Sequence, residues 1–323
     1  MVYSVAMNTM SDYAVILCAR MSSERLPGKA LVSYSPDGQT NLAQIAARWQ
    51  ASDREPSIII ATTDDAEDAP IVAEAKRLKL PCYRGSRDDV VGRMAGALLA
   101  FAPDAKYIAR GMADSPLVDV GLADWRLDVL ADTGVDSMHY GMYCNGGGKW
   151  HDNHERLSYA ATTDVWSRAA WDTIARESTG EEREHPGAYY WQHLNKFSTV
   201  SLTLPRREYM RPDIRTELDA PEDLAMFKRL WLGAMNNRAD DCVPTLWAMS
   251  YLAAHSELTA INADVQLKTQ SAAHWTRGRY FFCKECQTRA GSVVEGNLVV
   301  QCQKCGAAVK FYAHPPLRKH RNE

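Results

Sequence analysis

The feature that most restricts the fold is a series of short apolar segments that alternate with segments of helical periodicity. Residues 13–19 read YAVILCA and Ser57–Thr63 read SIIIATT, and each has the length of one strand buried on both faces. The other expected strands and helices lie at residues 41–50, 67–79, around 82, 88–101, 107–110 and from about 120. Asn41 is expected to cap the first helix. The alternation predicts an α/β fold with a mainly parallel sheet flanked by helices.

Three polar loops follow three of these strands. They cover residues 20–29, 62–68 and 111–119, and their charge is hard to reconcile with burial in a core. The carboxyl ends of parallel strands meet at one crevice, which is where open α/β sheets bind ligands. We therefore expect the three loops to surround a single site.

The first loop concentrates cations and hydrogen-bond donors. Arg20, Arg25 and Lys29 supply positive charge, and Ser22 supplies a hydroxyl group. A bound triphosphate needs such groups to balance its negative charge. A solvated basic turn would have the same composition, and the loop is neither a Walker sequence nor a GxGxxG turn. The loop residues alone leave both interpretations open.

Several motifs in order narrow the choice. They read ARMSSERLPGK, IIIATTDDAEDAPI, YRGSRDDVVGRM, ARGMADSPLVD, REHPGAYYWQHLNKF and DIRTELDAPEDLAMF. Together they resemble, in sequence and spacing, the cytidylyltransferases that activate sugar acids, particularly the branch of spore coat polysaccharide biosynthesis protein F. The resemblance covers about residues 12–232. It implies a glycosyltransferase-A-like nucleotidyltransferase fold and transfer of CMP from CTP to a sugar or sugar acid, although UTP or another nucleotide stays open.

The same resemblance assigns roles to residues of the loops. The residues that it places at the nucleotide are Ala19, Arg20, Ser22, Arg25, Lys29, Thr62, Arg84, Ser86, Arg93 and Arg110. Within this set, Arg20 and Lys29 would neutralise the charge of departing pyrophosphate, while Arg84, Ser86 and Arg93 would lie by the base and ribose.

Two aspartates, Asp114 in ADSP and Asp219 in LDAPED, share the form D-x-P although they are far apart in the chain. In related cytidylyltransferases the equivalent aspartates bind Mg²⁺, and hard carboxylate oxygens suit that ion. Each aspartate also precedes a proline and an expected helix, so each could instead be a helix cap. We count Asp114 and Asp219, with Arg20 and Lys29, as the expected catalytic residues, acting in a direct in-line transfer without a covalent intermediate.

The acceptor side is less defined. By resemblance, His185 and Tyr189 would orient the sugar, and Arg211 and Arg215 would meet an acidic acceptor. A structural histidine and arginines paired with neighbouring carboxylates are the competing interpretations. The segment between Tyr140 and Ser167 departs from the family pattern, so analogy does not assign the acceptor.

Four cysteines near the end of the chain form two C-x2-C pairs, Cys283 with Cys286 and Cys302 with Cys305. Their spacing predicts a structural zinc ribbon with Zn²⁺ held by four thiolates and no open coordination position. Disulfides and a redox pair are disfavoured. The basic and aromatic residues around the ribbon would suit docking on its own chain, oligomerisation or contact with a nucleic acid or a protein.

The sequence divides into three expected parts. Residues 12–233 form the nucleotidyltransferase domain, residues 234–270 a helical connector with an apolar face, and residues 271–323 the zinc-ribbon module with a basic tail. The net charge of -3 gives no general reason to expect a nucleic-acid partner. A nucleic-acid-associated nucleotidyltransferase recruited through the ribbon is the alternative function. No segment resembles a membrane span or a secretory signal, so we expect a cytoplasmic protein. The sequence leaves open whether the protein forms a homodimer.

Overall fold

A computed structural model describes most of the expected catalytic domain and parts of the remaining chain. The described residues are 11–140, 143–144, 150–151, 163–193, 196–202, 209, 211, 213–237, 243–265, 299–301 and 308–310. The four cysteines expected to bind zinc lie outside these residues.

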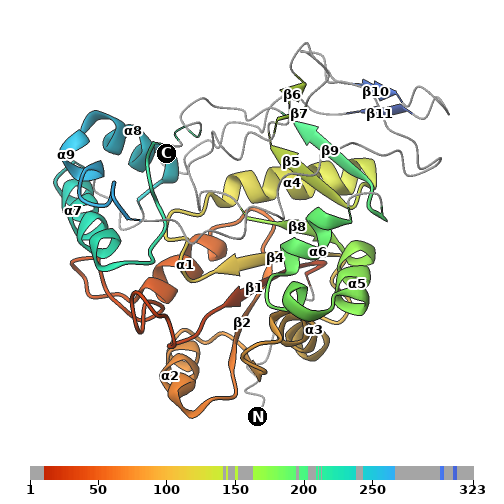
Figure 1. Ribbon diagram of the computed structural model, residues 1–323, viewed down its shortest axis with the longest axis horizontal. Helices are drawn as coiled ribbons and strands as arrows, with labels where there is room; N and C mark the ends of the chain where they lie inside the picture. The colour runs from red at the N-terminus through yellow and green to blue at the C-terminus, as the bar shows by residue number, and fades with distance from the viewer. Residues whose placement is uncertain are drawn as a thin grey trace.

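The described residues form a seven-stranded sheet in the order β3-β2-β1-β4-β8-β5-β9 (Figure 1). Its strands are β1 (Tyr13–Cys18), β2 (Ser57–Thr63), β3 (Cys82–Gly85), β4 (Tyr107–Met112), β5 (Ser137–Tyr140), β8 (Val165–Ser167) and β9 (Thr199–Leu202). Strands β3, β2, β1 and β4 pair in parallel, as do β5 and β9. Only β8 runs antiparallel to its neighbours in this sheet of described residues. The prediction of a mainly parallel sheet flanked by helices is confirmed.

Helices cover both faces of the sheet (Figure 1). They are α1 (Asn41–Gln50), η1 (Ala66–Asp68), α2 (Ala69–Arg77), α3 (Val90–Phe101), α4 (Val120–Thr133), α5 (Arg168–Glu177), η3 (Gly180–Arg183), α6 (Pro186–Gln192), α7 (Pro221–Asn237), α8 (Thr245–Ala254) and α9 (Ser256–Thr259). Two short strand pairs, β6 (Tyr143–Cys144) with β7 (Trp150–His151) and β10 (Val299–Gln301) with β11 (Ala308–Lys310), lie outside the main sheet.

Helices on both faces of the sheet explain why the sequence of β1 is apolar at every position. Successive side chains of a strand point to opposite faces. Val15 and Leu17 pack with α1, α2 and α4 on one face, whereas Ala14 and Ile16 pack with α3, α5 and α6 on the other. A strand covered on both sides needs an apolar residue at each place. The first polar loop therefore begins directly after a strand that is packed on both faces.

The N-terminal cap of α1 differs from the expectation. Thr40, not Asn41, caps the helix, because the Thr40 hydroxyl accepts a hydrogen bond from the backbone N–H of Ala43. Asn41 is the first helical residue, and its buried side chain donates to the carbonyl oxygens of Lys29 and Ala113. The prediction for Asn41 was wrong because its amide group is hydrogen-bonded to these two carbonyl oxygens, which are distant in sequence, and not to the start of the helix.

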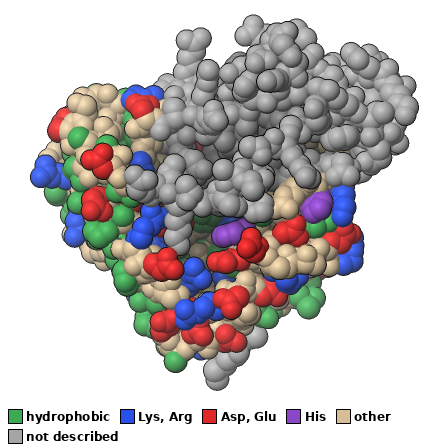
Figure 2. All heavy atoms as spheres, in the orientation of Figure 1, with side chains coloured by type: hydrophobic (Ala, Val, Ile, Leu, Met, Phe, Trp, Pro, Cys, Tyr) green, Lys and Arg blue, Asp and Glu red, His purple; other side chains and the backbone are tan. Residues whose placement is uncertain are grey.

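Charged side chains on the face drawn in Figure 2 are interleaved, with acidic and basic groups side by side. Arg87 pairs with Asp65 and Glu67, and Arg183 binds both carboxylate oxygens of Asp89 at 2.9 and 2.8 Å. Such pairs neutralise each other locally. Across the described residues, no helix has both the length and the hydropathy needed to cross a bilayer.

Gly111 of β4 generates a test of the packing beside the site. A Cβ atom at this position would lie 2.1 Å from Cδ2 of the buried Leu17. We expect Gly111→Ala to lower the free energy of unfolding by about 1–3 kcal/mol, because a filled core must distort to accept a methyl group. Gly121→Ala on α4 is the control, since a Cβ atom there would meet only the Asp119 side chain, at 3.2 Å. Urea unfolding that shows equal stability for both variants would contradict this account.

Candidate active site

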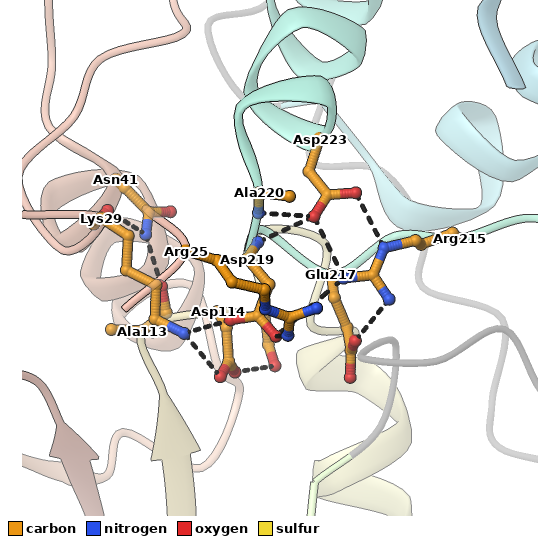
Figure 3. A network of polar contacts seen from close by, with 11 residues as sticks. Arg25, Lys29, Asn41, Ala113, Asp114, Arg215, Glu217, Asp219, Ala220 and Asp223 are labelled. Carbon is orange, nitrogen blue, oxygen red and sulfur yellow. Dashed lines mark hydrogen bonds and ion pairs between the residues drawn. The ribbon is translucent and has the colours of Figure 1, made fainter. Parts of the chain in front are cut away.

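The charged site lies where β1, β4 and the N-terminus of α7 meet (Figure 3). Lys29 follows β1, Asp114 follows β4, and Asp219 precedes α7. The Lys29 ammonium nitrogen lies 3.1 Å from Asp114 Oδ2 and 2.5 Å from Asp219 Oδ1. Arg25 approaches the other oxygen of Asp219 at 2.6 Å. Four residues predicted as site residues, from three distant segments, are thus in direct contact.

The proximity of opposite charges changes the proton affinities of this group. Burial alone would lower the pKa of Lys29, but Asp114 and Asp219 outweigh it and raise the pKa above its usual value. Burial would raise the pKa of Asp219, and Lys29, Arg25 and Arg215 together bring it below its usual value. Lys29 and Asp219 are therefore held in their charged forms at neutral pH.

Backbone contacts hold the two aspartate segments in register. The Leu218 N–H donates to the carbonyl oxygen of Asp114 at 2.9 Å. Asn41 joins the Lys29 and Ala113 carbonyl oxygens, and it accepts a hydrogen bond from the Tyr34 hydroxyl. The site geometry thus rests on the scaffold as well as on the ion pairs.

Asp223, on the first turn of α7, organises the loop that carries Asp219 (Figure 3). Its Oδ2 atom accepts hydrogen bonds from the backbone N–H groups of Asp219 and Ala220, both at 2.9 Å. Arg215 binds the two oxygens of Asp223 at 2.8 and 3.1 Å. A negative side chain that accepts backbone N–H groups at a helix start is stabilised there.

Glu217 is a further carboxyl group of this cluster that was not predicted. Arg215 donates to it at 2.9 Å. Burial, followed by the nearby charge of Asp114, raises the pKa of Glu217 to about 7, although Arg215 acts in the opposite direction. Arg215 contacts Glu217 at 2.9 Å and Asp219 at 4.0 Å, so these alternate residues lie together, and their spacing was the signal that could have revealed Glu217.

Asp68 connects the first two polar loops. It is fully buried, at 0% exposure, and accepts hydrogen bonds from the N–H of Met21 at 2.7 Å and from the Thr63 hydroxyl at 2.5 Å. The Thr62 hydroxyl also donates to it, at 3.0 Å. The contact of Asp68 with Met21 fixes the start of the cationic loop.

Two arginines expected near the base and ribose hold backbone carbonyl groups. Arg84 donates to the carbonyl oxygens of Thr63 and Asp65 at 2.9 and 2.7 Å. Arg93 is buried and donates to the Ser86 carbonyl oxygen at 2.6 Å. These contacts shape the loops after β2 and β3, so contact with a nucleotide stays a prediction for both arginines. The remaining expected nucleotide residues, Ala19, Arg20, Ser22 and Arg110, belong to the ends of β1 and β4 or the loop between β1 and α1.

Among the expected acceptor residues, Arg215 belongs to the network around Asp219, through its bonds to Asp223 and Glu217. Tyr189 is buried, and its hydroxyl group lies 2.6 Å from Glu177 and 2.7 Å from Lys196, where it ties α6 to α5. Arg211 pairs with Asp213 on the surface. His185 lies directly before α6. Acceptor contact stays a prediction for all four residues.

The donor set suits a divalent cation that also binds substrate. Among the described residues, no three His, Cys, Asp or Glu side chains form a complete metal cage. Mg²⁺ is usually held by one or two carboxylates and completes its shell with water and substrate phosphates. Asp114 and Asp219 converge on one cation, the Lys29 ammonium group, so their oxygen atoms can share a positive charge.

A mainly parallel sheet whose carboxyl edge gathers a cationic loop and paired carboxylates defines a class of enzyme that acts on nucleoside phosphates, the nucleotidyltransferases. The family model for cytidylyltransferases matches residues 14–244, and the chain belongs to this family. The expected nucleotidyltransferase activity class and the family read from the motifs are thereby confirmed.

Proteins similar to this chain come from several bacteria. The spore coat polysaccharide biosynthesis protein SpsF of Bacillus subtilis is 27% identical over 230 residues, covering 69% of this chain and 87% of SpsF. A 3-deoxy-manno-octulosonate cytidylyltransferase of Neisseria meningitidis is 27% identical over 127 residues, covering 39% of this chain and 48% of that enzyme. The structure of a cytidylyltransferase from Leptospira borgpetersenii has a TM-score of 0.65 at 18% identity, covering 79% of this chain and 98% of that one. This last likeness supports the fold.

Glu217 generates a prediction about the stability of the metal-free protein. Its carboxyl group has a folded-state pKa of about 7 against an ordinary value of 4.5, so the folded state binds more protons between these pH values. Its contribution to stability is complete below pH 4.5 and is lost as the pH rises through 7. Besides Asp114 and Arg215, Asp219 and Asp223 act on this group.

We expect Glu217→Gln, which does not titrate, to match the wild type at pH 5 and to be more stable at pH 8, by on the order of 2 kcal/mol. Urea unfolding in the presence of a chelator measures both values. Glu257→Gln on the exposed side of α9 is the control. A Glu217→Gln effect that is equal at the two pH values would rule out the raised pKa.

Proposed function

We propose that the protein is a Mg²⁺-dependent cytidylyltransferase that transfers CMP from CTP to a sugar or sugar acid and releases pyrophosphate. The observation that carries the proposal is the convergence of Asp114 and Asp219 on the Lys29 ammonium group beside the cationic loop. The names of SpsF and of the 3-deoxy-manno-octulosonate cytidylyltransferase support a role in the synthesis of a polysaccharide or glycan.

In the proposed reaction, a sugar hydroxyl oxygen loses its proton to water and forms a bond to the α-phosphorus of CTP, and the bond from that phosphorus to the pyrophosphate oxygen breaks. Mg²⁺, held by Asp114 and Asp219, would supply positive charge to the phosphate oxygens. Lys29 and Arg25 already lie against these carboxylates, so both cations can turn to the phosphates without leaving the site. Arg20 would add a third cation of the same loop. Positioning and electrostatic stabilisation account for such catalysis.

The proposal is tested by incubating the protein with Mg²⁺, each nucleoside triphosphate in turn, and a panel of nonulosonic and simpler sugars. We expect pyrophosphate release with CTP and at least one sugar. Asp114→Asn and Asp219→Asn should each reduce kcat by about 100-fold or more, because each removes a proposed ligand of the ion that would stabilise the developing negative charge. Asp172→Asn, which removes only a surface partner of Arg168 on α5, is the control.

The proposed function would be contradicted if the protein released no pyrophosphate with any sugar, or if pyrophosphate release were unchanged in both aspartate variants. Salt-sensitive binding of the protein to DNA or RNA, lost on removal of residues 271–323, would instead support the nucleic-acid-associated alternative.

We also propose that Cys283, Cys286, Cys302 and Cys305 hold one structural Zn²⁺. The antiparallel strands β10 and β11, which flank the second cysteine pair in sequence, support a ribbon at this position. We expect elemental analysis of the purified chain to find about one zinc per chain, because four thiolates complete a tetrahedral shell. Cys302→Ser should lose that zinc, whereas Cys18→Ser, which changes a free cysteine on β1, should keep it. Equal zinc content in both variants would contradict this site.

A further inference from the structure

The segment that follows the matched family region packs onto the candidate active site. The family model ends at residue 244, whereas α8 and α9 occupy residues 245–259 and described chain continues to residue 265. Met249, Leu252 and Leu258 from this segment are buried in one core with residues of α7 and with Leu218, which directly precedes Asp219. The expected helical connector is therefore in contact with the loop that carries a proposed metal ligand.

One polar side chain of this segment reaches the site network. Asn262 is 1% exposed, and its Nδ2 atom donates to Asp223 Oδ1 at 2.9 Å and to the Arg215 carbonyl oxygen at 3.3 Å. Asp223 is itself 0% exposed. Both contacts of this buried amide go to residues that flank Asp219 in the chain. Because hydrogen bonds are directional, they fix the position of these residues more closely than apolar packing does.

Both oxygens of the Asp223 carboxylate accept hydrogen bonds from several donors. Oδ2 accepts from the backbone N–H groups of Asp219 and Ala220 and from Arg215 Nη2, while Oδ1 accepts from Arg215 Nε and from Asn262. A carboxylate offers about four acceptor positions, so these donors fix its orientation. Without Asn262, Oδ1 would lose a donor in a buried place, and a rotation of Asp223 would move the Asp219 backbone with it.

We propose that Asn262 is a positioning residue that sets the place of the Asp219 carboxylate through Asp223 and Arg215. The proposal rests on the proposed function in one respect, the assignment of Asp219 as a metal ligand. Segment 245–265 thereby completes the active site from outside the region that the family model covers.

The test compares two variants of the same segment in the full chain. Asn262→Leu removes the amide at similar volume, and Leu258→Ala removes buried apolar contact without touching the polar network. Both should lower the melting temperature. Mn²⁺ binding, followed by the electron paramagnetic resonance signal of the free ion, should separate them, with Asp219→Asn as the reference for a lost ligand.

We expect Asn262→Leu to weaken Mn²⁺ binding about tenfold, the loss equivalent to one hydrogen bond to a charged group, and Leu258→Ala to change it less than about twofold. In pyrophosphate release, Asn262→Leu should lower kcat and leave the KM for CTP near that of the wild type, since the loop after β1 is intact. Asn262→Ser, which keeps a shorter donor, should lie between wild type and Asn262→Leu and serves if the leucine variant does not fold.

The proposal is overturned if folded Asn262 variants bind Mn²⁺ as the wild type does, or if Leu258→Ala weakens binding as much as Asn262→Leu. A wild-type protein that binds Mn²⁺ through Asp219 but releases no pyrophosphate would contradict the proposed reaction, and the Mn²⁺ comparison would still decide the role of Asn262.

Discussion

The contact of the Lys29 ammonium group with Asp114 and Asp219 is the interaction on which the site depends. It joins three segments that are distant in the chain, one after β1, one after β4 and one before α7. Two carboxylates that both contact one ammonium group would repel each other if that cation were absent. The fold brings the segments together, and the lysine makes their proximity favourable. A divalent ion with phosphates would meet carboxylates that are already oriented.

Much of the fold was predictable because the signals were local. Strands β1 and β2 are apolar at consecutive positions since helices cover both of their faces, and that pattern is visible in a single segment. The cap of α1 was not predictable in the same way. Thr40 and Asn41 are neighbours and both are good capping residues, and the choice between them depends on two carbonyl groups that only the folded chain brings near.

The candidate site shows the same division. Lys29, Asp114 and Asp219 were recognisable because each belongs to a motif of its own, and the structure brings them into contact. Asp68 contacts Met21 and Asn262 contacts Asp223, and in each pair the two residues are far apart in sequence. The pKa of Glu217 is raised chiefly by burial, which composition does not show. For Arg84 and Arg93 the motifs predicted nucleotide contacts, and the structure adds bonds to backbone carbonyl oxygens that the motifs did not indicate.

The short helix α9 has a consequence for how the protein responds to heat. Four residues make too few internal hydrogen bonds to sustain a helix, so α9 persists through its packing against α7 and α8. Peripheral segments of this kind open at a lower free energy than the strands of a central sheet. Opening here would withdraw the Asn262 amide while the sheet stays intact. Thermal inactivation should accordingly begin as a local, reversible event, several degrees before the cooperative melting of the molecule.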